Sequence, residues 1–391
     1  MSDPIAIVGA ARTPMGGFQG ELSAAKASEL GAVAIKAALE RAGVAASAVD
    51  EVLMGCVLPA GQGQAPARQA AFGAGLPEGV PCTTVNKMCG SGMKTVMMAM
   101  DQLRAGEGDV VVAGGMESMT NAPYVVPKMR GGARLGHAEM KDHMFLDGLE
   151  DAYEEGRLMG SFAEDCATEF QFTREQQDAY AIGSLEAALK AQTDGWFDRE
   201  VAPVVLKTRN GDVTVTTDEQ PRNARPDKIP TLKPAFKKDG TITPANASSI
   251  SDGAAALVLM READAGGHPV RARILSHASH AQAPGAFTTA PIMAIEKALA
   301  KAGWTKNDVD LWEINEAFAV VPMAAARELA IPRDKLNVNG GACALGHPIG
   351  ASGTRIIVTL LHEMERRGVK RGVASICIGG GEGTAVTIER D

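Results

Sequence analysis

Reactive side chains occur in three Gly-rich segments of the chain. Cys89 precedes Gly-Ser-Gly, His347 lies in Gly-His-Pro-Ile-Gly, and Cys377 precedes Ile-Gly-Gly-Gly. Only the thiolate form of a cysteine is a good nucleophile. The start of a helix contributes about 0.3–1 kcal/mol, less than the ~1.36 kcal/mol that corresponds to one pKa unit. Cys89 therefore needs a neighbouring base, and we predict that His347 supplies it.

Two further residues could complete such a site. Cys377 could act as a general acid or base, and the glycines after it let backbone N–H groups approach an oxyanion. Asn315, in Glu-Ile-Asn-Glu-Ala-Phe-Ala, could hold a water or orient an imidazole. Taken singly, each of these residues is more often structural, because most lone cysteines are buried fillers and Asn commonly ends strands.

The sequence is duplicated, and the reactive residues differ between the two copies. Residues 34–50 return as residues 294–310 with the same residue at eight positions. Residues 86–92 likewise correspond to 347–353, and residues 112–117 to 377–382. Across the copies, the pairs are Cys89 with Gly350, His347 with Asn86, Cys377 with Val112 and Asn315 with Gly55. Because duplicated halves pair about a pseudo-dyad, we expect these groups to meet in one pocket.

The elements that would position these residues alternate between strands and helices. We predict helices over residues 25–42, 90–103, 291–302, 317–329 and 351–367, and strands that include 5–8, 51–58, 109–113, 310–314, 336–338 and 372–378. This alternation predicts an α/β fold with mostly parallel sheets. A strand at 255–260 would complete the first copy. We therefore predict a first domain of residues 1–118 plus 250–270, an inserted domain at 119–249 and a second domain at 271–391.

Composition narrows the possible functions. The chain has 391 residues and a net charge of −8, which argues against a nucleic-acid or anionic-membrane binder. Its six cysteines form no C-x-x-C pair, so we expect neither a metal site nor disulfides. No signal peptide or apolar run of membrane-spanning length is visible, and we predict a cytoplasmic protein. The phosphate-binding glycine motifs and the G-x-S-x-G motif of serine hydrolases are both absent.

Seven ordered segments resemble the thiolase family, and the resemblance covers essentially the whole chain. They are A-A-R-T-P, V-N-K-M-C-G-S-G-M-K, A-G-G-M-E-S-M, N-A-S-S-I-S-D-G-A-A-A, N-E-A-F-A, N-V-N-G-G-A-C-A-L-G-H-P-I-G-A-S-G and C-I-G-G-G-E-G. The resemblance implies a duplicated five-layer αβαβα core with an inserted loop domain. It also implies a homodimer or homotetramer.

The resemblance further implies a mechanism. Cys89 would carry the acyl group after activation by His347, and Cys377 would transfer the α-proton of a second thioester. One oxyanion site would combine His347 with a water held by Asn315, and the other would use the N–H groups of Cys89 and Gly380. Coenzyme A would be substrate and product, with no prosthetic group. Its predicted contacts are Met159, Arg222, Leu232, Phe236, Ala247, Ser248, Ala317 and Phe318.

Four functions are compatible with the sequence. The first is reversible Claisen condensation of two acetyl-CoA molecules to acetoacetyl-CoA and CoA. The second is a degradative 3-ketoacyl-CoA thiolase that prefers longer chains. This chain departs from short-chain members at Leu158, where a His is common, and at Phe287, where a Met is common. A Cys-His-Asn hydrolase would leave Cys377 and the duplication unexplained, and a non-catalytic acyl-CoA-binding relative would not need the four polar groups.

Overall fold

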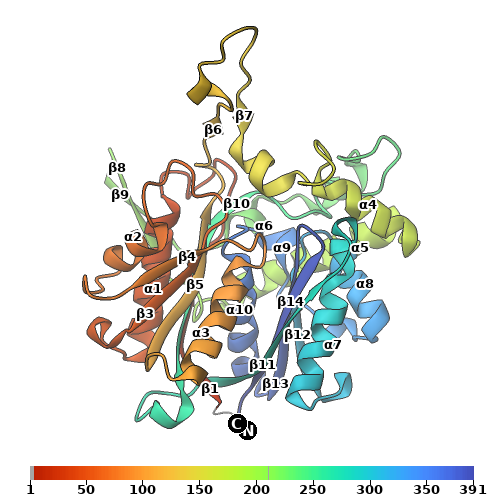
Figure 1. The fold of residues 1–391 in the computed structure, drawn as a ribbon. Coiled ribbons are helices and arrows are strands. Elements are labelled where there is room, and N and C mark those ends of the chain that lie inside the picture. The colour runs from red at the N-terminus through yellow and green to blue at the C-terminus, as the bar shows by residue number, and fades with distance from the viewer. Residues whose placement is uncertain (1–3, 210) are drawn as a thin grey trace.

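The structure is a computed structural model that describes residues 4–209 and 211–391. In this part of the chain a ten-stranded sheet runs through the molecule (Figure 1). Its order is β12 (Leu311–Ile314), β13 (Arg371–Ile378), β14 (Glu382–Glu389), β11 (Ala272–Ala281), β1 (Ile5–Arg12), β10 (Ser251–Arg261), β5 (Val110–Ser118), β3 (Glu51–Gly55) and β4 (Cys82–Val85), with β2 (Gly16–Gly17) paired to β10.

The sheet consists of two halves with the same topology. On one side β3 runs parallel to β5, β5 antiparallel to β10, and β10 antiparallel to β1. On the other side β12 runs parallel to β13, β13 antiparallel to β14, and β14 antiparallel to β11. The two halves join where three residues of β1 pair with three of β11. The duplication in the sequence is therefore a duplication of the fold.

Helices cover the sheet halves in three layers. One outer layer contains α1 (Ala27–Ala42) and α2 (Pro66–Gly73), and the other contains α7 (Ala290–Ala302) and α8 (Val320–Leu329). Between the halves lie α3 (Ser91–Ala105) and α10 (Ser352–Arg367), whose apolar side chains pack against strands of both halves. The result is the five-layer arrangement that the resemblance to the thiolase family implied.

Equivalent helices end at equivalent glycines. Gly43 after α1 has φ +62°, and Gly303 after α7 has φ +70°. A non-glycine residue with this left-handed backbone is strained, so the repeated Ala-Gly pair stops both helices at the same point. Each glycine N–H returns to a carbonyl of the last turn, which satisfies the helix end.

Residues 119–249 contain further elements, and an arm projects from the body of the molecule (Figure 1). They are β6 (Tyr124–Val125), β7 (Lys141–Asp142), α4 (Met159–Glu169), α5 (Arg174–Thr193), β8 (Val204–Thr208), β9 (Gly211–Val215) and α6 (Glu219–Asn223). The arm consists of β6, β7 and the loop that joins them (Figure 1). The short helix α9 (Ala342–Leu345) from the second copy packs against α5 and α6.

Two expectations about the sheet are wrong. The sheet is mixed rather than mostly parallel, because β10 and β14 lie antiparallel to both of their neighbours. Residues 336–338 form no strand, only a single bridge between Trp312 and Leu336. The Asn337 backbone adopts φ +46°, and its side-chain amide exchanges two hydrogen bonds of 2.8 Å with the backbone of Ile314. A side chain thus replaces a strand partner at this edge.

Candidate active site

The predicted nucleophile lies in a tight turn between β4 and α3. Lys87 N–H donates to Ser91 Oγ at 2.8 Å, and Ser91 Oγ donates to the carbonyl of Met88 at 2.6 Å. Met88 adopts φ +47°, a conformation that non-glycine residues rarely take. Cys89 follows this constrained residue directly, two positions before α3 begins. Such local strain is typical of functional positions that the surrounding structure holds in place.

The two candidate thiols lie close enough for one to influence the other. Although Cys89 is partly exposed, burial raises the pKa of its thiol to about 11, and N–H groups of Gly379 and Cys89 itself oppose this shift. Burial, and then proximity to Cys89, raise the pKa of Cys377 well above its usual value. Both shifts favour the neutral thiol. The Gly379 and Cys89 N–H groups are placed to stabilise negative charge on sulfur.

The imidazole of His347 has a defined hydrogen-bonding state. Ser352 Oγ lies 3.0 Å from the carbonyl of Pro348 and 2.5 Å from His347 Nδ1. The single hydroxyl proton goes to the carbonyl, so the serine oxygen accepts from Nδ1–H. His347 Nε2 is then an unprotonated, buried atom without a partner among the described residues. Burial, and then Arg355, lower the pKa of His347 to about 3, which keeps the ring neutral and leaves a lone pair on Nε2.

His347 and Cys89 approach each other through the loop 347–350. Ile349, two residues after His347, belongs to a small apolar cluster against which Cys89 packs. A Cβ added to Gly90 would lie 2.4 Å from the side chain of Ile378, which follows Cys377. The structure therefore brings the segments of Cys89, Cys377 and His347 together from both halves of the molecule.

Asn315 lies at the end of β12 with its side chain unused. Its backbone N–H donates to the carbonyl of Ser375 at 2.9 Å, which fixes it beside the strand that carries Cys377. Both side-chain atoms, Oδ1 and Nδ2, are buried and have no partner among the described residues. A buried amide without partners carries a free-energy cost, so a ligand or ordered water is expected to bind it.

Two glutamates of the repeated G-G-x-E segments link the halves. Glu117 accepts hydrogen bonds from the N–H groups of Val57 (2.9 Å), Leu58 (3.1 Å) and Gly350 (2.8 Å). Its counterpart Glu382 forms an ion pair with Lys87 beside Cys89. Each half thus holds the reactive loop of the other. Burial raises the pKa of Glu117 to about 7, against the lowering effect of its backbone donors.

Two cavities open near this constellation. One of about 260 Å³ is lined in part by Met88, Met159, Gly379 and Gly380. Gly380 has φ +92° and nothing within 4 Å of the Cβ position, so its backbone faces open space. The other cavity, of about 330 Å³, is lined in part by Leu232 and by the cations Arg225 and Lys228.

Two of the residues predicted to contact coenzyme A line these cavities, Met159 the smaller one and Leu232 the larger one. Most of the others contact one another. Ala247 forms a bridge with Phe318, and Ser248 N–H donates to the carbonyl of Ala317 at 2.9 Å. Phe236 packs edge-on against Phe318 with ring centres 6.1 Å apart. The guanidinium of Arg222 donates to Glu21 at 2.7 Å and does not line the 330 Å³ cavity. Arg225 and Lys228 line it instead.

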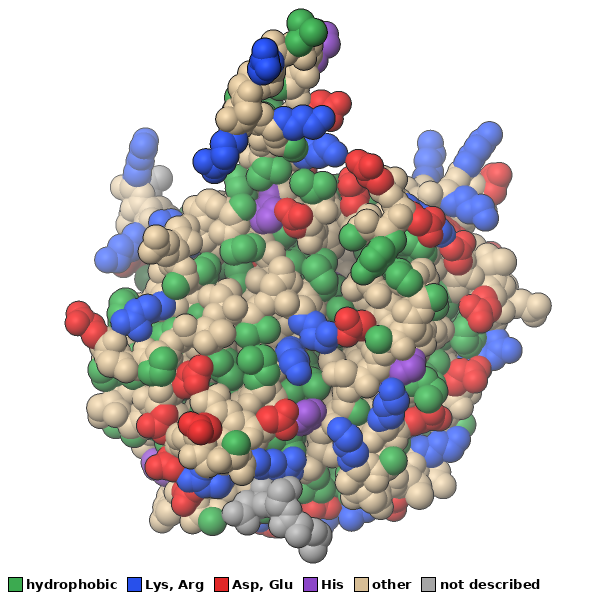
Figure 2. Space-filling view, in the orientation of Figure 1, with side chains coloured by type: hydrophobic (Ala, Val, Ile, Leu, Met, Phe, Trp, Pro, Cys, Tyr) green, Lys and Arg blue, Asp and Glu red, His purple; other side chains and the backbone are tan. Residues whose placement is uncertain are grey.

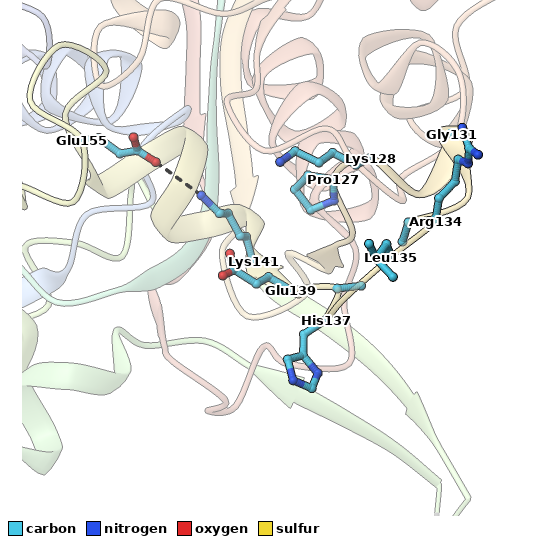
Figure 3. Close-up of a pocket in the computed structure, with 11 residues that line it drawn as sticks. Pro127, Lys128, Gly131, Arg134, Leu135, His137, Glu139, Lys141 and Glu155 are labelled. Carbon is cyan, nitrogen blue, oxygen red and sulfur yellow. Dashed lines mark ion pairs between the residues drawn. The ribbon is translucent and has the colours of Figure 1, made fainter.

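A separate hollow on the arm contains no candidate nucleophile. Its lining includes Lys128, Arg134, Leu135 and His137, and Lys141 pairs with Glu155 at 3.6 Å (Figure 3). In the described part of the chain, no cluster of three or more His, Cys, Asp or Glu is arranged to hold a metal ion. None of the described helices has the length and hydropathy needed to cross a membrane.

Sequence reasoning missed Ser352 and Glu117 as positioning residues. Ser352 corresponds to Ser91 in the first copy, and each serine oxygen bonds to the turn that precedes it. Glu117 corresponds to Glu382. The signal that could have identified both residues is identity across the two copies at positions beside the ones that differ.

Comparisons with known proteins agree with this fold. The family model described as "Thiolase, N-terminal domain" matches residues 5–263, and "Thiolase, C-terminal domain" matches residues 268–390. The acetyl-CoA acetyltransferase of Cupriavidus necator is 52% identical over 390 residues, 99% of both chains. That of Pseudomonas aeruginosa is 50% identical over 391 residues, also 99% of both.

A solved structure extends the similarity to three dimensions. The crystal structure of the Bacillus anthracis acetyl-CoA acetyltransferase has a TM-score of 0.96 and 41% sequence identity, and 99% of each chain is covered. The duplicated five-layer fold and paired thiols thus define a class of acyl-transfer enzymes. The chain belongs to the thiolase family.

Proposed function

We propose that this protein catalyses the reversible condensation of two acetyl-CoA molecules to acetoacetyl-CoA and CoA. The observation that carries the proposal is that Cys89 and Cys377 come from opposite halves and that Cys89 lies close enough to raise the pKa of the Cys377 thiol, with Gly379 N–H beside the sulfur of Cys89. Relatives about half identical over the full length carry the name acetyl-CoA acetyltransferase. Coenzyme A is thus the expected substrate and product, with no prosthetic group.

In the first half-reaction Cys89 Sγ attacks the thioester carbonyl of acetyl-CoA. Its proton passes to the free Nε2 of His347, which the Ser352 contact leaves available. The tetrahedral oxyanion would be stabilised by the N–H groups of Cys89 and Gly380. The departing CoA thiolate takes the proton of Cys377, which leaves an acetyl group on Cys89 and a thiolate at Cys377.

In the second half-reaction the Cys377 thiolate removes the α-proton of a second acetyl-CoA. The enolate attacks the acetyl group on Cys89 and forms the new carbon–carbon bond, and Cys89 leaves and regains its proton from His347. Protonated His347 and a water held by Asn315 would stabilise the thioester enolate. Each proton is thereby returned, and no metal or redox group is needed.

The cavities support a binding mode for coenzyme A. Its phosphates would lie at the 330 Å³ cavity near Arg225 and Lys228, and its pantetheine arm would pass Ser248, Ala247 and Phe318 toward Met159. Phe287 is buried and packs edge-on against Phe162 and Phe318. A filled aromatic cluster beside Cys377 favours a short acyl group, which supports acetyl transfer over longer-chain thiolysis.

Further properties stay proposals of the same kind. The predicted domains at 1–118 plus 250–270, 119–249 and 271–391 remain a prediction, as do a cytoplasmic location and a role in fatty acid metabolism. A homodimer or homotetramer is supported by the arm, where Leu135 is 98% and Met140 72% exposed. Figure 2 shows the arm projecting with apolar and basic side chains on its surface. Large exposed apolar side chains of this kind are commonly covered by another subunit.

The test separates the two thiols. Cys89→Ser is expected to abolish labelling of the protein by radiolabelled acetyl-CoA. Cys377→Ser is expected to keep that labelling but slow condensation about 10³-fold, because general acid–base catalysis contributes on the order of 10²–10⁴. Acetyl label on Cys89→Ser, or equal loss of both steps in Cys377→Ser, would contradict the proposal. Faster thiolysis of long 3-ketoacyl-CoA than of acetoacetyl-CoA would favour the degradative alternative.

A further inference from the structure

A further cavity, lined mainly by positively charged side chains, lies away from the thiols. Its volume is about 610 Å³, and four guanidinium groups and the imidazole of His362 line it together with only two carboxylates. The four arginines are Arg41, Arg199, Arg271 and Arg390. His362 lies ten residues after Ser352 along α10, which corresponds to about 15 Å of helix at ~1.5 Å per residue.

Two of these guanidinium groups have no acidic partner. Arg41 donates only to the carbonyls of Ala10, Glu200 and Val201, at 3.0, 2.9 and 2.8 Å. Arg390 donates to the carbonyls of Arg271 and Met364 at 3.1 and 3.0 Å. Among the described residues, neither lies within ion-pair distance of a carboxylate. Neither guanidinium is therefore bonded directly to a carboxylate, although Glu200 and Glu40 act on Arg41, and Asp391 on Arg390, from a longer distance.

The remaining two arginines share one carboxylate. Arg271 forms a two-pronged pair with Glu365, with both N–O distances 2.8 Å, and Arg199 lies 3.5 Å from the same group. Asp198, the second carboxylate of the lining, is exposed. Burial, and then the charge of Arg271, lower the pKa of Arg41, as expected where like charges are gathered. An anion would relieve this repulsion.

His362 adds chemical selectivity to the positive charge. The residue is only 6% exposed, and its Nδ1–H donates to the carbonyl of Val358 at 2.8 Å. Nε2 therefore carries a lone pair, and no hydrogen bond reaches it from the described residues. A neutral imidazole nitrogen of this kind needs a donor. Chloride and sulfate have no proton to offer at neutral pH, whereas a phosphate group in its monoanionic form does.

We propose that this cavity is a phosphate site, in which the arginines bind the oxygens and Nε2 of His362 shares the proton of a P–OH group. The ligand is inorganic phosphate or the phosphate of a small phosphomonoester. A phosphomonoester, whose second pKa is near ~6, is largely dianionic at pH 7, so its binding takes up a proton from solution, and inorganic phosphate, which keeps a larger monoanionic fraction, takes up less. The proposal is independent of the acetyl-transfer reaction, because none of these residues belongs to the constellation around Cys89.

The test is calorimetric titration of the full chain at pH 7 and constant ionic strength with inorganic phosphate, methyl phosphate and sulfate. We expect saturable binding of phosphate at least tenfold tighter than that of sulfate. Two buffers with different ionisation enthalpies should report proton uptake. Tighter binding of methyl phosphate than of inorganic phosphate would identify a phosphomonoester as the ligand, and the reverse would identify free phosphate.

Matched variants assign the site. His362→Gln should remove the preference for phosphate and the proton uptake, and Arg199→Gln with Arg390→Gln should weaken both anions at least tenfold. Arg130→Gln, an exposed arginine of the arm, should change neither. Arg199 is 76% exposed, so Arg199→Gln alone serves if the double variant fails to fold. Phosphate binding no tighter than sulfate binding, or equal loss in Arg130→Gln or in Arg225→Gln of the 330 Å³ cavity, would overturn the proposal.

Discussion

The loop that leads into α3 and the loop that leads into α10 occupy corresponding places in the two halves, but only the first carries a thiol. A Cβ added to Gly350, the counterpart of Cys89, would lie 2.6 Å from Glu117 Oε2 and 2.8 Å from the carbonyl of Met116. Real Cβ atoms do not approach other atoms so closely. The second half therefore has no room for a nucleophile at this position.

In the first half, steric packing excludes a side chain at the position that corresponds to Asn315. A Cβ added to its counterpart Gly55 would lie 2.8 Å from the carbonyl of Gly350 and from the N–H of Gly92. The first half thus cannot carry an amide where the second half does. Backbone packing across the pseudo-dyad, and not only the choice of side chains, therefore restricts the molecule to one catalytic pocket.

Exchanging the residues that differ between the halves should have the largest effect. His347→Asn gives the second half the residue of the first, and we expect acetylation of Cys89 to slow about 10³-fold because the base is removed. Stopped-flow release of CoA from acetyl-CoA measures this step. An unchanged rate would show that another group activates the thiol.

The same variant has a pH signature. The pKa of folded His347 is about 3, below the ~6.5 of an unfolded histidine, so its stabilising contribution is present above pH 6.5 and is lost as pH falls toward 3. His347→Asn should flatten this acid limb by up to ~1.4 kcal/mol per pH unit. Denaturant unfolding between pH 4 and 7 measures it. His268→Gln, a half-buried histidine outside the pocket, is the control.

Adding a side chain at Gly350, where the packing leaves no room for one, should have the next largest effect. Gly350→Ala places a methyl group against Glu117 and Met116, and overpacking of this kind costs about 1–3 kcal/mol. We expect a lower free energy of unfolding, together with slower acetylation because the loop of His347 shifts. Gly79→Ala, where nothing lies within 4 Å of the Cβ, should be nearly neutral. Equal effects of the two changes would refute the steric explanation.

Removing the support of the imidazole should have a smaller effect. Ser352→Ala leaves the Nδ1–H of His347 without its acceptor, so the ring loses its fixed tautomer. We expect kcat to fall about 10–100-fold, and the rate of Cys89 alkylation by iodoacetamide to fall in parallel. Ser352→Thr should restore most of the activity because it keeps the hydroxyl. A change in KM without a change in kcat would argue against this role.

Substitution of the two glutamates should have the smallest effects, and these effects should be on the free energy of unfolding. Glu117→Gln replaces one of the two carboxylate oxygens, which accept buried N–H groups, with an NH2 group that cannot accept. This should lower the free energy of unfolding by about 1–3 kcal/mol. Glu382→Gln weakens a partly exposed ion pair with Lys87, worth about 0–1 kcal/mol. Denaturant unfolding at pH 8 compares the two variants. A larger loss in Glu382→Gln would reverse the assignment of the buried link.

The fold could be predicted because its elements are repeated in the sequence. The candidate reactive residues could be predicted because they stand at positions that differ between the two copies. The repeat of residues 34–50 located α1 and α7 and their terminal glycines, and the altered positions identified Cys89 and His347. The long helix α5 within the insertion was not predicted, although Thr173 caps it through a hydrogen bond to Gln176 N–H. Its buried residues are half Ala or Ser and include the polar Gln177 and Asp178, so no strong apolar periodicity marks the helix.

Other features depend on contacts that no local pattern encodes. Asn337 replaces a strand partner through its side chain, and Arg222 turns toward Glu21, about two hundred residues away in the chain. The tautomer of His347 follows from where one hydroxyl proton goes. Such hydrogen bonds between distant segments become visible only when the backbone is placed.

The contact between Gly350 and the segment Met116–Glu117 also constrains how this chain can change over time. An ancestor with identical halves would have offered two equivalent pockets. Once the backbones had closed to their present separation, no single substitution could reopen the second pocket, because a new side chain would meet main-chain atoms on arrival. The loss of one catalytic centre is therefore not reversed by a single substitution, and selection for catalysis acts on the remaining centre.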